Sequence, residues 1–285
     1  MVTRRDAAVA AILFAAATMA GCSCGHHPDS GTVRLSSPSG SAVVSLKGGR
    51  ILSWKDASGR ELFFMPAKKE SPGGDWSHGG TSLCWPWFGR KGTEPSMIHG
   101  FARNRMFSLR GRQKVDGGES VTFGLEVSGS DNANFPHDAD VELSVVLTDR
   151  LVLKLKTANH GDAPFEITEG FQSYFPVSGY DKIVFSGIEK DDFAAVDGMD
   201  KAFRRLPGDF GFKDTSRGCE LKMKAAGNSG LVVWTPGKVE PANRNLAPDD
   251  CSKFVVLGPS CRAAEGAVTV KPGESHELVC ELSFH

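Results

Sequence analysis

The residues best suited to chemistry lie in two short segments, His78–Gly89 and His99–Arg103. The first, HGGTSLCWPWFG, places two tryptophans, a proline and a phenylalanine in four consecutive positions beside glycine-rich turns. The second reads HGFAR and begins ten residues after the first ends. Aromatic rings beside such turns form flat platforms for the C–H faces of a polar ring, while His and Arg supply hydrogen-bond donors. The pattern therefore predicts a sugar-binding surface.

These segments resemble the signature of the hexose-6-phosphate mutarotases, relatives of aldose 1-epimerase. That signature reads roughly R-G-G-I-P-x-C-W-P-W-F-G, followed by H-G-F-A-R. CWPWFG and HGFAR match it letter for letter, whereas His78 stands at the opening Arg and Thr81 and Ser82 stand at the Ile-Pro. Further resemblance lies in Gly48–Trp54, Asn159–Phe165, Val232–Gly237 and Val270–Ser275.

The resemblance covers nearly the whole chain after residue 36. It implies an all-β fold, a large antiparallel β-sandwich of galactose-mutarotase type, as a single domain over residues 37–285. It also implies a sugar or sugar phosphate as ligand and no cofactor.

Mutarotation needs an acid that protonates the ring oxygen and a base that removes the proton of the anomeric hydroxyl. The family resemblance assigns these roles to a His in a segment like L-H-T-Y-F and a Glu in a segment like C-V-E-P. The matching segments here are FQSYF and VLGP, so Gln172 and Gly258 occupy the two positions. Glutamine does not titrate and glycine has no side chain. We therefore expect carbohydrate binding with the catalytic acid and base lost.

The alternative is an active hexose or hexose-6-phosphate 1-epimerase with relocated acid and base. Glu169, Asp181 and His78 are the candidates for such a rescue. Glu169 lies three residues before Gln172, so strand alternation predicts that it faces the opposite side of the sheet. Paired carboxylates for glycoside hydrolysis stay open, because spacing in sequence does not give their separation in space.

The predicted sugar-binding residues are His78, His99, Arg103, Gln172 and Asp197. Two of them have an equally simple structural interpretation: His99 as a hydrogen-bonded residue near a turn, and Arg103 as a partner in a surface ion pair. Trp85 and Trp87 are more often core residues than platforms. A phosphate would be favoured by an anion-binding patch of Arg90, Lys91, Arg103 and Arg105.

The N-terminus resembles a bacterial lipoprotein signal. Arg4 and Arg5 precede an apolar run, Ala7–Ala20, that is too short to span a bilayer. Met19-Ala20-Gly21-Cys22 reads as a lipobox, which predicts a signal peptide over residues 1–21, lipidation of Cys22 and a flexible tether over residues 22–36. The alternative is an ordinary signal peptide in which Cys22 is incidental. We expect a protein of the bacterial cell envelope, lipid-anchored and facing the periplasm or the cell surface.

Composition narrows the function further. The 285 residues carry a net charge of −1, which argues against a nucleic-acid partner. Seven cysteines fit an exported protein, and the bracket Cys251–Cys261 is one possible disulfide in an oxidising compartment. The cysteine spacings match no zinc motif, so no metal site is predicted.

The remainder reads as short strands separated by turn signals, which favours a sandwich or barrel. One segment, Met199–Leu206, is interpreted as a weak helix. The expected strands are Ala42–Leu46, Gly49–Trp54, Glu61–Met65, Ser120–Val127, Val141–Leu147, Leu151–Lys156, Phe165–Phe171, Lys182–Gly187, Cys219–Lys224, Gly230–Trp234, Lys253–Leu257, Ala267–Val270 and Glu277–Phe284.

Overall fold

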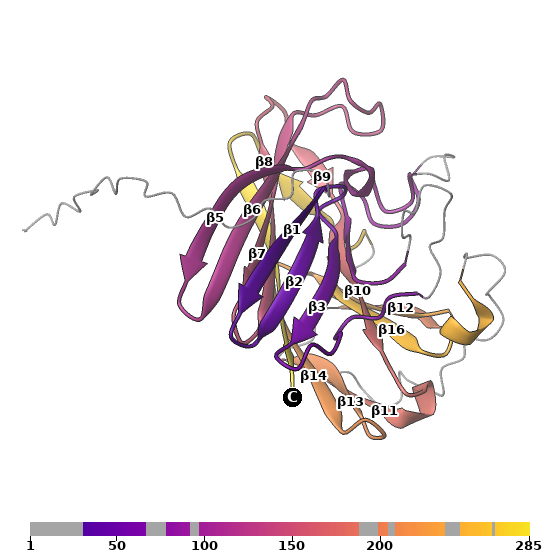
Figure 1. Cartoon of the computed structure of the whole chain (residues 1–285). Coiled ribbons are helices and arrows are strands. Elements are labelled where there is room, and N and C mark those ends of the chain that lie inside the picture. The colour runs from indigo at the N-terminus through magenta and orange to yellow at the C-terminus, as the bar shows by residue number, and fades with distance from the viewer. Residues whose placement is uncertain are drawn as a thin grey trace, which may run out of the picture. The chain divides into compact units, whose positions relative to one another are not determined.

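The architecture is a sandwich of two large antiparallel sheets (Figure 1). The computed structural model describes residues 31–66, 78–91, 97–187, 199–204, 209–236, 246–263 and 266–285. These belong to one compact unit, Gly31–His285. Regular structure in the described residues consists of strands and three short 3₁₀ helices, η2 (Ala102–Asn104), η3 (Tyr180–Lys182) and η6 (Pro248–Asp250). The expectation of an all-β, antiparallel fold is confirmed.

Each large sheet has eight strands. The first sheet runs β1 (Thr32–Ser37), β2 (Gly40–Ser45), β3 (Ile51–Asp56), β4 (Thr81–Cys84), β10 (Glu169–Pro176), β16 (Phe254–Cys261), β15 (Gly230–Thr235) and β12 (Met199–Arg204). The second runs β11 (Ile183–Ser186), β13 (Phe210–Asp214), β14 (Cys219–Ala226), β18 (Ser275–Phe284), β8 (Leu151–Asn159), β7 (Ala139–Leu147), β6 (Gly118–Val127) and β5 (Ser108–Val115). A separate pair joins β17 (Val268–Val270) to β9 (Phe165–Ile167).

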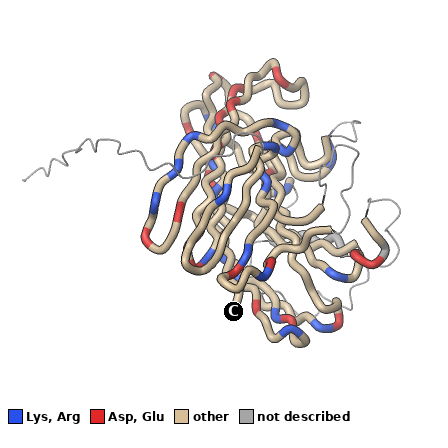
Figure 2. The backbone as a smooth tube through the Cα atoms, in the orientation of Figure 1, with Lys and Arg blue, Asp and Glu red and all other residues tan. Residues whose placement is uncertain are grey.

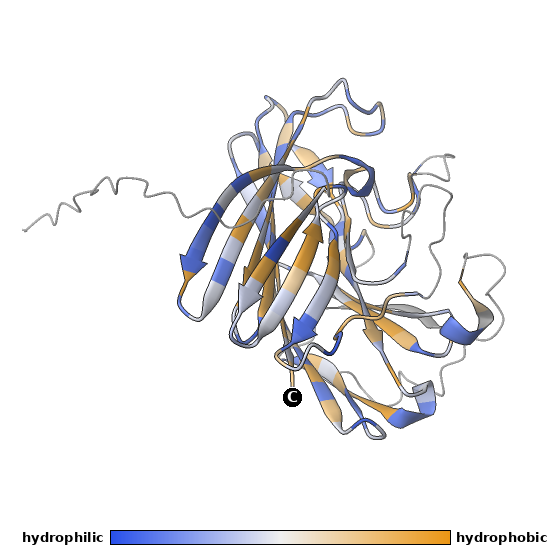
Figure 3. Cartoon of the chain, viewed as in Figure 1, coloured by the Kyte–Doolittle hydropathy of each residue, from blue (hydrophilic) through white to orange (hydrophobic). Residues whose placement is uncertain are grey.

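The core lies between the two sheets, and strand alternation produces it. Along β7 buried and half-buried residues alternate strictly, as expected of a strand with one face in the core. By contrast, every residue of β16 is buried, because a second apolar cluster covers its other face. Figure 3 shows the corresponding apolar colouring along the strands. The first sheet therefore carries packed side chains on both of its faces around β16.

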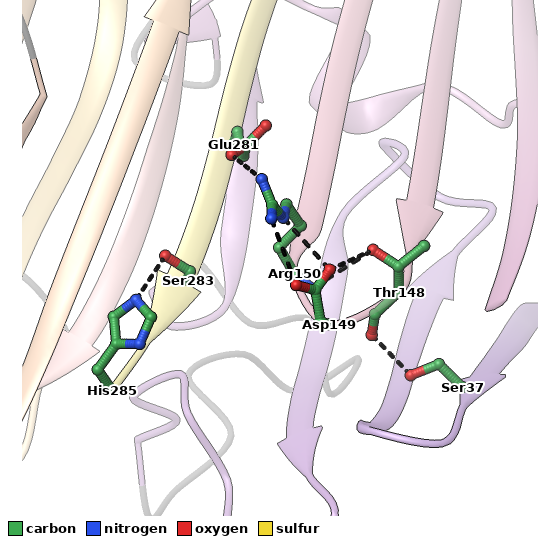
Figure 4. Close-up of polar contacts among 7 residues, drawn as sticks. All are labelled: Ser37, Thr148, Asp149, Arg150, Glu281, Ser283 and His285. Atoms are coloured by element: carbon green, nitrogen blue, oxygen red, sulfur yellow. Dashed lines mark hydrogen bonds and ion pairs between the residues drawn. The ribbon is translucent and has the colours of Figure 1, made fainter. Parts of the chain in front are cut away.

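Polar contacts also join elements that are distant in the sequence (Figure 4). Arg150, at the turn between β7 and β8, bonds Asp149 and reaches Glu281 of β18 at 2.8 Å. The hydroxyl of Ser37 in the first sheet donates to the carbonyl of Thr148 at 2.8 Å. This turn thus connects the second sheet to the end of β1.

Several expectations about local structure are wrong. Met199–Leu206 was expected to be helical, but Met199–Arg204 form β12, which pairs with β15 at the edge of the first sheet. The predicted tether, residues 22–36, ends too late, because Thr32–Ser37 form β1. Glu61–Met65 is no strand beyond a single bridge at Glu61. The expected strand Phe165–Phe171 is broken at Thr168 into β9 and β10.

The proposed Cys251–Cys261 disulfide is also wrong, because both thiols are free. Cys251 precedes β16 and Cys261 ends it, so an extended strand of eight residues holds them apart. Charges of both signs occur throughout the described chain, as Figure 2 shows. No helix in the described part of the chain is long and apolar enough to cross a membrane.

Candidate sugar-binding site

The candidate site lies on the face of the first sheet that points away from the core, which we call the site face. Phe171 and Phe175 of β10 belong to the core between the sheets. Because side chains alternate along a strand, Gln172 and Tyr174 point to the opposite face. The strand thus presents the predicted residue Gln172 on the site face.

The two positions assigned to acid and base by the family resemblance are brought together. In the ladder of β10 and β16, Gly170 pairs with Ser260 and Ser173 with Leu257. Gln172 and Gly258 lie side by side in the interval between these pairs, where a Cβ on Gly258 would be 3.6 Å from the Gln172 nitrogen. The two residues therefore supply one neutral amide and no second side chain.

Polar groups surround this pair on the same face. Gln172 is half-buried, and its side chain makes no hydrogen bond with another described residue. Its neighbour on β4 is Ser82, and Ser260 lies two residues beyond Gly258. The Oγ atoms of Ser82 and Ser260 are buried without a hydrogen-bond partner among the described residues. Buried hydroxyls are ordinarily satisfied, so these three side chains form a set of donors and acceptors suited to a polyhydroxylated ligand.

The aromatic platform consists of residues that the sequence analysis did not select. Tyr174, Trp234 and Phe254 form part of the apolar cluster on the site face. His78 joins them: its ring lies nearly parallel to Trp234, with centroids 6.1 Å apart, and edge-on to Tyr174 at 5.9 Å. The predicted binding residue His78 therefore stands on the site face beside Tyr174, which is two residues along β10 from Gln172.

Trp85 and Trp87 are core residues instead of platforms. Their exposed fractions are 0% and 4%, and Trp85 Nε1 donates to the hydroxyl of Thr157 at 2.9 Å. The next residue, Phe88, emerges half-buried, and a Cβ at Gly170 would lie only 3.0 Å from its ring. The aromatic segment thus anchors the site from within the core and brings one ring, Phe88, beside β10.

His99 connects the two motif segments. Its backbone has a φ of 65°, which is unusual for a residue other than glycine. The N–H of Gly89 donates to His99 Nδ1 at 3.1 Å, and the ring lies edge-on to Phe88 at 4.9 Å. His99 thus has the hydrogen bond that its structural interpretation expects, and its ring lies against Phe88 beside the site.

Two guanidinium groups lie near Cys84, a buried neighbour of Gly170 across the ladder. Burial raises the pKa of the Cys84 thiol to about 12, while the positive charges of Arg103 and Arg262 oppose this rise. Arg262 also lies 5.3 Å from the centre of the Phe88 ring. Arg103 and Arg262 thus place positive charge at the end of the site face formed by Cys84 and Gly170.

Sequence reasoning missed Arg262, although a signal was present. Arg262 directly follows β16, the strand that carries Gly258, so its place in the sequence is next to the predicted site. Two members of the predicted anion-binding patch, Arg105 and Lys91, have other contacts. Arg105 is held by Asp131 at 2.7 Å, and Lys91 Nζ lies over the Trp87 ring at 5.4 Å.

The other candidates fall elsewhere. Glu169 faces the core, as alternation predicts, where it lies 3.2 Å from His276 and accepts a hydrogen bond from Thr157. Asp181 lies in η3, beyond the end of β10, and pairs with Lys182 at 2.7 Å. Asp197 and Cys22 lie outside the described residues. Of the three candidates for a relocated acid or base, His78 alone has contacts on the site face.

Comparison with known proteins gives a consistent assignment. The family model described as aldose 1-epimerase matches residues 31–194. A relative from Escherichia coli, named provisionally as a glucose-6-phosphate 1-epimerase, is 25% identical over 255 residues and covers 84% of this chain and 85% of its own. A relative from Cenchrus ciliaris with the same name is 26% identical over 260 residues, covering 82% and 78%.

Solved structures show the same fold. A protein of Salmonella typhimurium, described provisionally as a mutarotase, superposes with a TM-score of 0.78 at 21% identity over 89% of this chain and 90% of its own. A galactose mutarotase-like protein from Clostridium acetobutylicum gives a TM-score of 0.69 at 14% identity, covering 89% and 95%.

Proposed function

Because the chain belongs to the aldose 1-epimerase family, we propose that its site face binds a hexose or hexose phosphate without catalysing epimerisation. The observation that carries this proposal is the pair Gln172 and Gly258. The two residues lie side by side on β10 and β16, at the positions where the family resemblance expects a His and a Glu. Around them are hydroxyl and amide groups that can bind a sugar, but Gln172 cannot exchange a proton at neutral pH.

The position of Glu169 supports the proposal, because its carboxylate cannot replace the missing acid or base. Its carboxylate is fully buried in the core, on the other side of the sheet from Gln172. A general acid or base must come within hydrogen-bond reach of the proton that it transfers. Glu169 therefore cannot act on a ligand at the site face without a rearrangement of β10.

A second candidate function, an active 1-epimerase, is favoured by His78. This imidazole lies against Tyr174 and Trp234 on the site face. Histidine exchanges protons near neutral pH, so it could serve as one of the two groups that ring opening requires. The two candidate functions predict different rates of mutarotation, which can be measured.

We expect mutarotation of α-glucose and α-glucose 6-phosphate to proceed at the uncatalysed rate in the presence of the protein. Each missing acid or base group typically contributes about 10²–10⁴-fold. Polarimetry or NMR exchange measures the rate, with an active aldose 1-epimerase as positive control. A clear rate enhancement that disappears in His78→Gln would replace the binding proposal by the second candidate.

We also propose that the protein is an exported lipoprotein, anchored in the cell envelope through Cys22. The support is the sequence Met19-Ala20-Gly21-Cys22 after a short apolar run. Cys22→Ser is expected to abolish metabolic labelling with a radioactive fatty acid and to remove the protein from the membrane fraction. Cys24→Ser is the matched control and should be labelled normally. Equal labelling of Cys22→Ser would show that Cys22 is not the anchor.

A further inference from the structure

A second polar cluster lies inside the sandwich, on the side of the first sheet opposite to the site face. Glu169 and Cys261 face each other across the ladder of β10 and β16, and His276 reaches them from β18 of the second sheet. Each residue offers one ligand atom: a carboxylate oxygen, the thiol sulfur or a ring nitrogen. These three atoms all lie within 4.8 Å of one another. The cluster joins three strands that are far apart in sequence.

Burial makes this cluster unusual. Glu169 is 0% exposed and Cys261 is 1% exposed. Glu169 Oε1 and His276 Nε2 are 3.2 Å apart, yet both atoms are buried without a hydrogen bond of acceptable geometry. A buried ion-pair contact without a well-aligned hydrogen bond offsets only part of the cost of burying a carboxylate. The position of this carboxylate beside a thiol and an imidazole is therefore suited to a bound cation.

The remainder of the carboxylate is held in place. Thr157 donates its hydroxyl proton to Glu169 Oε2 at 3.4 Å, and the same hydroxyl accepts the indole N–H of Trp85 at 2.9 Å. Such outer contacts orient the ligands of a metal ion and fix which oxygen faces it. The aromatic motif residue Trp85 thus contributes, through Thr157, to the position of Glu169.

We propose that Glu169, Cys261 and His276 bind a zinc ion between the two sheets. A thiolate, an imidazole and a carboxylate are the three ligand types that zinc takes in proteins. Zinc–ligand bonds of about 2.0–2.3 Å hold neighbouring ligand atoms about 3–4 Å apart. The 3.2 Å between Glu169 Oε1 and His276 Nε2 already fits, and a small side-chain movement closes the remainder of the cluster.

Burial favours a metal over a reactive thiol. Cys261 is too deeply buried to meet an organic substrate, whereas the His276 side chain is 19% exposed. A bound zinc ion would link β10 and β16 to β18.

The proposal is tested by titrating the full chain with cobalt and with zinc. The protein is first stripped of metal with a chelator and is kept reduced. We expect one equivalent of Co²⁺ to bind with a thiolate-to-cobalt charge-transfer absorption, and Zn²⁺ to displace it. Cys261→Ser should lose this absorption, and His276→Gln should weaken binding at least tenfold. Cys219→Ser, which removes another buried thiol, is the matched control and should retain both.

The N-terminal residues Cys24, His26 and His27 offer another source of metal ligands. The titration is therefore repeated in a chain carrying Cys24→Ser, His26→Asn and His27→Asn, where the absorption should persist. Circular dichroism checks that each variant is folded without metal, and His276→Gln decides the question if Cys261→Ser does not fold. Retention of the absorption in both cluster variants, or no stoichiometric Co²⁺ binding by the wild type, would overturn the proposal.

Discussion

Replacing Gly258 by alanine is expected to destabilise the protein by about 3 kcal/mol, near the upper end of the usual cost of overpacking. A Cβ at this position would lie 1.7 Å from the carbonyl oxygen of Phe171 and 2.7 Å from its carbonyl carbon. Both atoms belong to the backbone of β10, so no side-chain rotation relieves the clash. Two central strands of the first sheet would have to separate.

Chemical denaturation followed by circular dichroism measures this change in the free energy of unfolding. Gly111→Ala is the matched control, since Gly111 also lies in a strand but a Cβ there meets nothing within 4 Å. The control should stay within about 0.5 kcal/mol of the wild type. A Gly258→Ala protein as stable as the control would show that β10 and β16 can separate at little cost.

The same clash bears on the evolution of the site. Restoring the expected acid and base together, as Gln172→His with Gly258→Glu, meets the Phe171 carbonyl before any catalytic geometry can form. Gln172→His alone should fold, because the Gln172 side chain is half-buried and bonds no other described residue.

Strand alternation and turn signals were sufficient to predict the architecture from the sequence, but not every element. Met199–Arg204 contains good helix formers, yet it forms an edge strand because pairing with β15 satisfies its backbone. β4 was missed because Thr81–Cys84 is short and buried on both faces, which leaves no alternation to detect. Tertiary context decided both cases.

For the site, local motifs were sufficient to find the segments, but they did not predict what each residue in them does. CWPWFG was recognisable, but whether its tryptophans face the core or a ligand depends on packing that spacing does not encode. Glu169, Cys261 and His276 have no common spacing at all, since the register of β10 with β16 and the approach of β18 bring them together. Alternation alone correctly assigned Glu169 and Gln172 to opposite faces.

Arg103→Ala and Arg262→Ala are each expected to weaken the binding of glucose 6-phosphate by about 10–150-fold. This corresponds to about 1.5–3 kcal/mol for a lost hydrogen bond to a charged group. Both guanidinium groups lie near Cys84, and Arg262 stands over Phe88, at one end of the row formed by Gln172 and Ser260. A hexose ring over Gln172 would direct its phosphate toward that end.

Isothermal titration calorimetry with glucose 6-phosphate and with glucose tests this orientation. Neutral glucose should bind in the micromolar to millimolar range, about −8 to −4 kcal/mol, and should lose less affinity in either variant. Arg105→Ala is the matched control, because Arg105 is two residues from Arg103 but is held by Asp131 at 2.7 Å. An equal loss in all three variants would indicate a general effect of surface charge. If neither ligand binds the wild type, the site face does not bind these hexoses and the binding proposal fails with it.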